Sequence, residues 1–129
     1  MFGILGGGSG TNIDDQRYLP MYDASLCDQN HESQCWTPLP LDGTVSKLYV
    51  SIALAPTQAN QGWRVTVRKN GTDTGLFCDL VGTGAVTCQD TSDTVTFSAG
   101  DRFDVGISVT PGFQKPSGSA LRYTAFYGN

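Results

Sequence analysis

The stretch from Trp63 to Asp90 constrains the fold more than any other, because it combines two turn signals with two cysteines. Asn70-Gly71 and Gly82-Thr83-Gly84 divide it into three segments in which apolar and polar residues alternate. Such alternation is typical of half-buried β-strands, and Asn-Gly suits the positive backbone angles of a type I′ hairpin turn. Cys78 and Cys88 are symmetric about the second turn, so antiparallel pairing would place them opposite one another. The sequence therefore predicts a three-stranded meander with a disulfide between its second and third strands.

Four cysteines can pair in three ways, and the symmetry of the second turn favours one of them. A Cys78–Cys88 disulfide leaves Cys27 to pair with Cys35. The latter two lie in a long loop over residues 23–42, and a loop of that length inside a compact domain is usually either functional or cross-linked. Each disulfide would stabilise the fold by about 2 to 3 kcal/mol.

Further segments of the chain also alternate between apolar and polar residues, and none has a helical period. They are residues 44–54, 94–97, 103–109 and 119–127, together with a short extended segment over 17–22 that Pro20 restricts to a sheet edge. Sixteen Gly and six Pro among 129 residues, with only 16% charged residues, suit an all-β chain with many turns. We predict a two-sheet antiparallel jelly-roll sandwich of about eight strands. An immunoglobulin-like sandwich is the alternative, but no Cys, Trp and Cys have its spacing.

The length suits a single domain, which we expect over residues 17–129 behind a flexible, Gly-rich N-terminal arm over residues 1–16. Apart from Met1, the only large apolar side chains among the first twelve residues are Phe2, Ile4 and Leu5. We expect them to dock the arm on a neighbouring protein. A disordered tail is the alternative interpretation.

The last predicted strand differs from the others because it is apolar on both faces. Leu121, Tyr123 and Tyr127 share one face, while Phe126 lies on the other. Apolar residues on both faces indicate burial on both sides, as in a central strand or an interface strand. We predict that these four residues contribute to an oligomer interface.

The charge balance limits the partners and the location of the protein. A net charge of -4 argues against nucleic acid, which requires a basic face. No apolar run reaches the roughly 20 residues of a membrane helix, so we expect no membrane span. The first residues lack the basic start of a secretion signal, although four cysteines are typical of an oxidising compartment. A protein made in the cytoplasm and released by lysis would reconcile these features, as would the loss of a leader.

We expect no catalytic residue, cofactor or metal. His31 lies between Cys27 and Cys35, but structural zinc needs four ligands, and one histidine is weak support for a catalytic triad. Paired carboxylates could serve glycoside hydrolysis, and residues 90–93 could bind calcium, yet aspartates of this kind usually cap turns. A small hydrolase is therefore the least supported hypothesis. The carboxylates considered are Asp79, Asp90, Asp93, Asp101 and Asp104.

Two loop aromatics and one sequon are possible recognition elements. Trp36 and Phe113 could stack on a sugar or anchor a partner, although loop aromatics more often pack beneath their own loop. The Asn70-Gly71-Thr72 triplet matches a glycosylation acceptor, but the hairpin turn explains it without a further assumption. Trp36 and Phe113 are therefore candidates for ligand recognition.

Four runs in the second part of the chain are LYVSIA (48–53), VTVRKNGTDTGLFC (65–78), VTCQDTSDTVTFSAGD (86–101) and LRYTAFY (121–127). Together they resemble a small domain of phage and bacterial surface proteins, of the TNF/C1q-like jelly-roll kind. The resemblance covers about two-thirds of the chain. It implies a trimeric, non-enzymatic module of a virion or other surface.

These features lead to a functional prediction. We expect a phage virion structural protein, most simply a homotrimeric capsid decoration or cement protein that docks on the major capsid protein through its N-terminal arm. It would be made in the host cytoplasm and released with the virion. The alternative is a receptor- or glycan-binding tip of a tail or head fibre, with a surface glycan as partner. The lack of heptads, collagen-like repeats or a second domain favours decoration.

Overall fold

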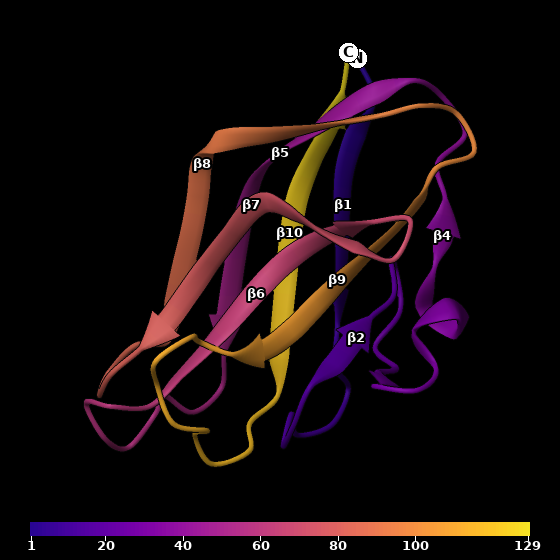
Figure 1. Cartoon of the computed structure of the whole chain (residues 1–129). Helices are drawn as coiled ribbons and strands as arrows, with labels where there is room; N and C mark the ends of the chain where they lie inside the picture. The colour runs from indigo at the N-terminus through magenta and orange to yellow at the C-terminus, as the bar shows by residue number, and fades with distance from the viewer.

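The protein is a sandwich of two antiparallel sheets, seen in a computed structural model that describes all of residues 1–129 (Figure 1). The four-stranded sheet has the order β1-β10-β5-β8, and the six-stranded sheet has the order β3-β2-β9-β6-β7, with β4 also paired to β9. The elements are β1 (Gly3–Gly8), β2 (Arg17–Leu19), β3 (Cys27–Asp28), the 3-10 turn η1 (Glu32–Cys35), β4 (Thr37–Pro38), β5 (Gly43–Ile52), β6 (Gly62–Lys69), β7 (Thr72–Val81), β8 (Thr87–Phe97), β9 (Arg102–Val109) and β10 (Leu121–Gly128). The structure contains no helix long and apolar enough to cross a membrane.

The chain passes repeatedly between the sheets, as in a jelly roll. The connections β5–β6, β7–β8, β8–β9 and β9–β10 each lead from one sheet to the other, whereas β6 and β7 are joined as a hairpin. Asn70 and Gly71 form that hairpin turn with positive φ angles of 53° and 80°, as the sequence predicts. The predicted all-β, jelly-roll-like sandwich is confirmed.

The core lies between the sheets and is formed by alternate residues of their strands. Trp63, Phe97, Phe103 and Tyr123 are its largest fully buried side chains. The predicted alternation of β5 holds over most of its length but not at its end. The predicted strand over residues 44–54 places Leu54 on the core face with Leu48, Val50 and Ile52, but β5 ends at Ile52 and Leu54 is 67% exposed.

Both predicted disulfides form, but the hairpin predicted around Cys78 and Cys88 does not. Their Cα atoms lie 5.8 Å apart, yet β7 and β8 belong to different sheets. Cys78 is paired with Val65 of β6, and Cys88 with Val50 of β5. The disulfide therefore joins the edge strands of the two sheets. The bond can cross between the sheets because both side chains are directed towards the interior: Cys78 is 6% exposed, and Cys88 packs against the core.

The Gly-rich N-terminal segment is a strand, so the prediction of a flexible arm over residues 1–16 is wrong. β1 pairs with β10 over six residue pairs, and Leu5 is 3% exposed in the core. The Phe2 ring packs on Tyr127, with centroids 4.8 Å apart, and Ile4, at 67%, is the one predicted docking residue that is largely exposed. A Cβ on Gly7 would lie 2.1 Å from the carbonyl oxygen of Pro20. Glycine is needed here for close packing, which the sequence pattern cannot distinguish from flexibility.

β10 is a central strand, which corrects the predicted oligomer interface. It lies between β1 and β5, and the other sheet covers its inner face. Leu121, Tyr123 and Tyr127 are each at most 5% exposed, because they fill the core. Of the four predicted interface residues, only Phe126 lies on the outer face, where it is half-buried. Apolar residues on both sides of this strand therefore reflect mainly the packing of the sandwich.

Candidate functional site

The predicted histidine and cysteine candidates do not assemble a catalytic or metal site. Cys27 and Cys35 are joined in a disulfide, so neither offers a thiolate. His31 Nδ1 lies 2.7 Å from Asp28 Oδ1 on the surface. The hydrogen bond from His31, together with one from the backbone N–H of Asn30, lowers the pKa of Asp28. No three His, Cys, Asp or Glu side chains are grouped so that they could hold a metal ion.

Most of the candidate carboxylates stabilise turns and strand edges, and only Asp90 and Asp93 among these interact with each other, at the exposed surface of β8. Asp79 accepts two hydrogen bonds from Arg64, at 2.9 and 3.1 Å. Asp101 accepts from the backbone N–H of Ser98, and Asp90 from those of residues 77, 92 and 93. These contacts are the capping role that aspartate commonly has in turns. The arrangement does not pair these carboxylates across a common cleft.

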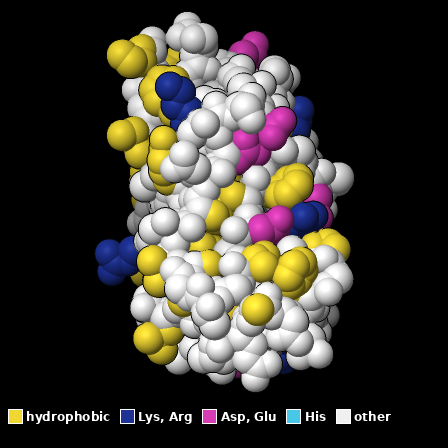
Figure 2. Space-filling model, turned by 90° about the vertical axis from the view of Figure 1, so that its left-hand side faces the viewer, with side chains coloured by type: hydrophobic (Ala, Val, Ile, Leu, Met, Phe, Trp, Pro, Cys, Tyr) yellow, Lys and Arg dark blue, Asp and Glu magenta, His cyan; other side chains and the backbone are white.

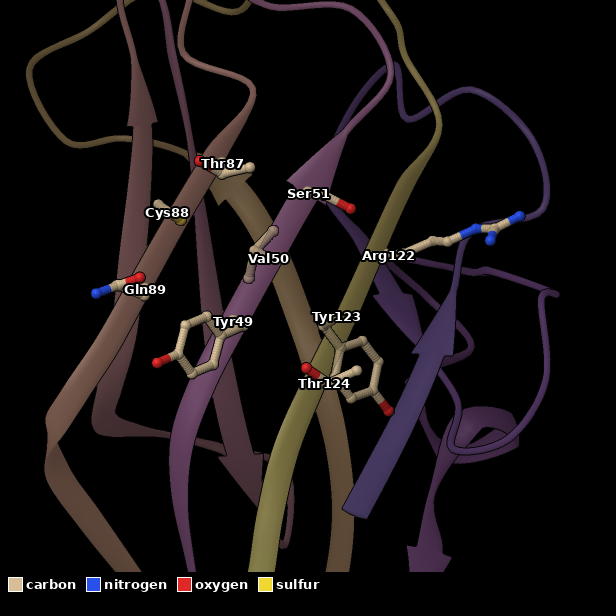
Figure 3. A pocket seen from close by; sticks show the side chains of 9 residues that line it. All are labelled: Tyr49, Val50, Ser51, Thr87, Cys88, Gln89, Arg122, Tyr123 and Thr124. Atoms are coloured by element: carbon tan, nitrogen blue, oxygen red, sulfur yellow. The ribbon is translucent and has the colours of Figure 1, made fainter.

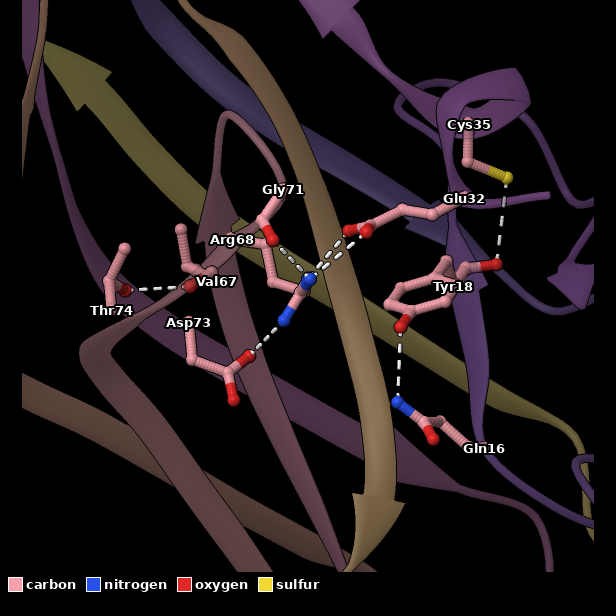
Figure 4. A network of polar contacts seen from close by, with 9 residues as sticks. All are labelled: Gln16, Tyr18, Glu32, Cys35, Val67, Arg68, Gly71, Asp73 and Thr74. Atoms are coloured by element: carbon pink, nitrogen blue, oxygen red, sulfur yellow. Dashed lines mark hydrogen bonds and ion pairs between the residues drawn. The ribbon is translucent and has the colours of Figure 1, made fainter. Parts of the chain in front are cut away.

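A buried ionic cluster around Arg68 connects the long loop to the six-stranded sheet (Figure 4). Arg68 donates to the Glu32 carboxylate at 2.5 and 3.0 Å, to Asp73 at 2.5 Å and to the carbonyl oxygen of Gly71 at 2.5 Å. Burial opposes the charge of Arg68, but the hydrogen bonds to Glu32 and Asp73 outweigh it and raise the Arg68 pKa. The Tyr18 ring lies 5.1 Å from the guanidinium. Glu32 thereby anchors the loop on β6.

Asp104 lies beside this cluster and is the least expected buried group in the molecule. It is opposite Arg68 in the β6–β9 pairing, it is fully buried, and neither carboxyl oxygen has a hydrogen-bond partner. Burial first, and then the adjoining Glu32 carboxylate, to which protonated Asp104 can donate and whose charge disfavours a second one, raise the pKa of Asp104 to about 8. The hollow next to Arg68 measures only about 30 Å³. Because ligand sites usually exceed about 300 Å³, we interpret the cluster as structural.

The two loop aromatics do not form a common recognition site. The Trp36 ring packs against Arg102, whose guanidinium carbon lies 4.2 Å from the ring centroid. Phe113 is 39% exposed in the loop between β9 and β10. Neither lines any of the larger hollows of the surface. Their use in ligand recognition stays a prediction.

The larger hollows lie elsewhere, and three of them meet on the outer face of the four-stranded sheet. Their volumes are about 350, 350 and 630 Å³, and Arg122 lines all three. We call the three together the sheet groove. Figure 3 shows one of them, crossing β8, β5 and β10, with Arg122 extending from β10 towards β1. Its outward side chains are Tyr49, Ser51, Thr87, Gln89, Arg122 and Thr124.

The charge on this face differs from that of the whole chain. In β1, β5 and β10 the only charged side chains are Lys47 and Arg122, both basic and exposed. β8 holds two aspartates, Asp90 and Asp93, which interact with each other, and Asp90 accepts from Phe77 N at the β7–β8 edge. The left-hand margin of Figure 2 is this face seen edge-on, with hydrophobic and basic side chains and no acidic ones. An otherwise acidic protein thus has one acid-poor face.

Sequence reasoning did not find the sheet groove. Tyr49 and Ser51 of β5 alternate with core residues, as do Arg122 and Thr124 of β10. The alternation within each strand therefore predicts which of its side chains face outward. Nothing local predicts that β10 lies beside β5, or that the glycines of β1 leave the space next to Arg122 open. Comparison with known proteins adds no assignment: no family model matches the chain, and no curated protein matches it. The TNF/C1q-like resemblance stays a prediction.

Proposed function

We propose that the chain is a non-enzymatic structural protein of a virion, a trimeric capsid decoration protein that docks on the major capsid protein. The supporting observation is an apolar hollow of about 390 Å³ at the end of the sandwich where both termini lie (Figure 1). Its lining includes Phe2, Leu5, Met21, Leu39, Leu41 and Tyr127. Met1 and Leu41, 91% and 51% exposed, project near the same end. We call this end, with its hollow and these two residues, the docking end. Exposed apolar surface of this kind is typical of interaction sites.

The rigidity of the sandwich also supports this role. One disulfide closes the β7–β8 edge, and the other joins β3 to the last residue of η1. At β1, the backbone of residues 22 and 23 pairs with Gly6 and Gly8, and the Tyr22 hydroxyl donates to the carbonyl oxygen of Ile4. Covered edges resist uncontrolled strand pairing. Covered edges and two disulfides suit a module that is displayed in many copies.

The trimer is tested by light scattering coupled to size exclusion. At micromolar concentration we expect a particle of three times the 13.8 kDa chain mass. A single species with the mass of one chain across the concentration series would contradict the trimer.

Docking is tested by co-sedimentation with capsids stripped of their decoration protein. We expect Leu41→Ser to weaken capsid binding about tenfold or more, because it removes an exposed apolar side chain from the docking end. Leu54→Ser is the matched control: Leu54 is comparably exposed but lies beyond the opposite end of β5. Equal binding by both variants and the unmodified protein would remove this end from the mechanism.

The second candidate function, a glycan- or receptor-binding tip of a fibre, is favoured by one observation, the sheet groove. The groove lies on a face of the sandwich, and Tyr22 alone lines both one of its hollows and the hollow at the docking end. A decoration protein could therefore display the groove while attached, and the ligand of the groove can be argued separately from the position of the protein in a virion.

A further inference from the structure

We propose that the sheet groove binds an oligosaccharide that carries carboxylate groups, with Arg122 as the carboxylate ligand. The proposal does not depend on the trimer or on the docking end. It is based on the contacts of Arg122, the shape of the groove and the side chains that surround it.

Arg122 is the only one of the five arginines whose side chain has no partner in the protein. Arg17, Arg64 and Arg68 are in ion pairs with carboxylates, and Arg102 contacts Trp36 and Asn70. Arg122 makes no ion pair, side-chain hydrogen bond or cation–π contact, although it lies where three hollows meet. A guanidinium binds a carboxylate through two parallel hydrogen bonds. Because the Arg122 guanidinium has no partner in the protein, it is free to bind the carboxylate of a ligand in this way.

Glycines give the groove its depth on one side of Arg122. Gly6, Gly7 and Gly8 of β1 line the 630 Å³ hollow, and a Cβ on Gly8 would lie 3.2 Å from Cγ of Arg122. Tyr22, 72% exposed, stands at the rim of this hollow. Asp23 is the one carboxylate at the rim, and it accepts a hydrogen bond from the backbone N–H of Ala24. The space can therefore receive a bulky polar unit without displacing a side chain.

The other side of Arg122 presents hydroxyl, amide and aromatic groups. Ser51, Thr87, Thr124 and Gln89 line the adjoining hollow, and Tyr49 is 47% exposed at its wall (Figure 3). Hydroxyl and amide side chains both donate and accept, which suits the hydroxyls of a sugar. A tyrosine ring offers an apolar face for the C–H side of a sugar and a polar tip for its hydroxyls.

Other acidic ligands fit this face less well. An acidic peptide that added a strand would need a free sheet edge, whereas the groove lies on the face of the sheet and the β1 edge is already covered. Nucleic acid binding depends on many basic contacts along the phosphates, and only Lys47 and Arg122 are available here. A short acidic saccharide needs one guanidinium and several neutral polar groups, which is what the groove provides.

Calorimetric titration of the whole chain tests the proposal with defined probes. The probes are trigalacturonate, a trimannuronate, 3′-sialyllactose, neutral maltotriose and a penta-glutamate peptide. We expect at least one acidic saccharide to bind, maltotriose to bind at least tenfold more weakly, and added salt to weaken the acidic ligand. Arg122→Gln should weaken the acidic saccharide about tenfold or more, as expected for loss of a charge-assisted pair.

Lys115→Gln is the matched control, because it makes the same change of charge in the β9–β10 loop, where Lys115 has no ion pair and lines none of the three hollows. It should leave the affinity unchanged, while Tyr49→Ala should lower it several-fold. The proposal is overturned if no acidic saccharide binds, if Arg122→Gln binds as tightly as the unmodified chain, or if penta-glutamate binds more tightly than every saccharide. The last outcome would instead indicate an acidic protein partner.

Discussion

Gly7→Ala should destabilise the protein by about 3 kcal/mol or more, an unusually large effect for one added methyl group. The Cβ would lie 2.1 Å from the carbonyl oxygen of Pro20 and 3.0 Å from the Tyr123 ring. The first contact is with backbone, so a change of side-chain rotamer cannot relieve it. β1 would have to move away from the segment that covers its edge. Urea unfolding followed by tryptophan fluorescence measures the loss, with Trp63 in the core as the reporter.

Gly3→Ala is the control for the intrinsic cost or gain of alanine in the same strand. Nothing lies within 4 Å of a Cβ at Gly3, so this variant should differ from the unmodified chain by less than about 1 kcal/mol. Comparing Gly7→Ala with Gly3→Ala shows whether residues 3–8 form a strand of the sheet or a flexible arm. In a flexible arm both substitutions would be harmless, so equal stability of the two variants would contradict the placement of β1.

The N-terminal strand illustrates how far sequence reasoning reaches in this protein. Periodicity predicts β5, β6 and β9 closely, because their large apolar side chains alternate towards the core. It does not predict that the opposite face of β6 and β9 is also buried, at Thr66 and Asp104. The Asn70-Gly71 turn is predictable for a similarly local reason. The glycines of β1 lack side chains, so they show no alternation of apolar and polar residues that would indicate which face is buried. Their role depends on segments more than ten residues away, and only the fold reveals it.

The Cys78–Cys88 disulfide marks a different limit. The symmetry of the turn predicts which cysteines pair, because proximity along the chain is enough for that. It does not predict whether two adjacent strands share a sheet, since edge strands of two packed sheets also bring cysteines together. The sheet groove was missed for the same reason. It requires β10 to lie between β1 and β5, which is a property of the topology and not of any strand alone.

Asp104 leads to the other large expected effect, which depends on pH. Its pKa in the folded protein is about 8, against 3.8 for an unperturbed aspartate. Between these values the folded chain holds a proton that the unfolded chain has released, so stability falls as pH rises through this window. The slope is at most about 1.4 kcal/mol per pH unit from this group. Below about pH 4 both states are protonated, and above about pH 8 neither is, so the contribution is constant there.

Asp104→Asn should remove this dependence, because asparagine has the shape of the protonated acid and does not titrate. We expect the variant to match the unmodified chain near pH 4 and to be more stable by about 2 to 5 kcal/mol at pH 8. Chemical denaturation at several pH values measures the difference. Because the other carboxylates are common to both proteins, their pH dependence largely cancels in the comparison.

Asp73→Asn tests whether the pH dependence of stability comes from the burial of Asp104 and not from the loss of any carboxylate near Arg68. Asp73 also pairs with Arg68, but its side chain is 70% exposed, so its loss should change stability by no more than about 1 kcal/mol.

If the unmodified chain and Asp104→Asn keep a constant difference in free energy of unfolding from pH 5 to pH 8, Asp104 is not a buried, protonated acid. If the predicted slope appears, the proton on Asp104 is what allows Glu32 to keep its charge and hold the long loop on Arg68. The attachment of that loop to the six-stranded sheet would then weaken as the pH rises towards 8.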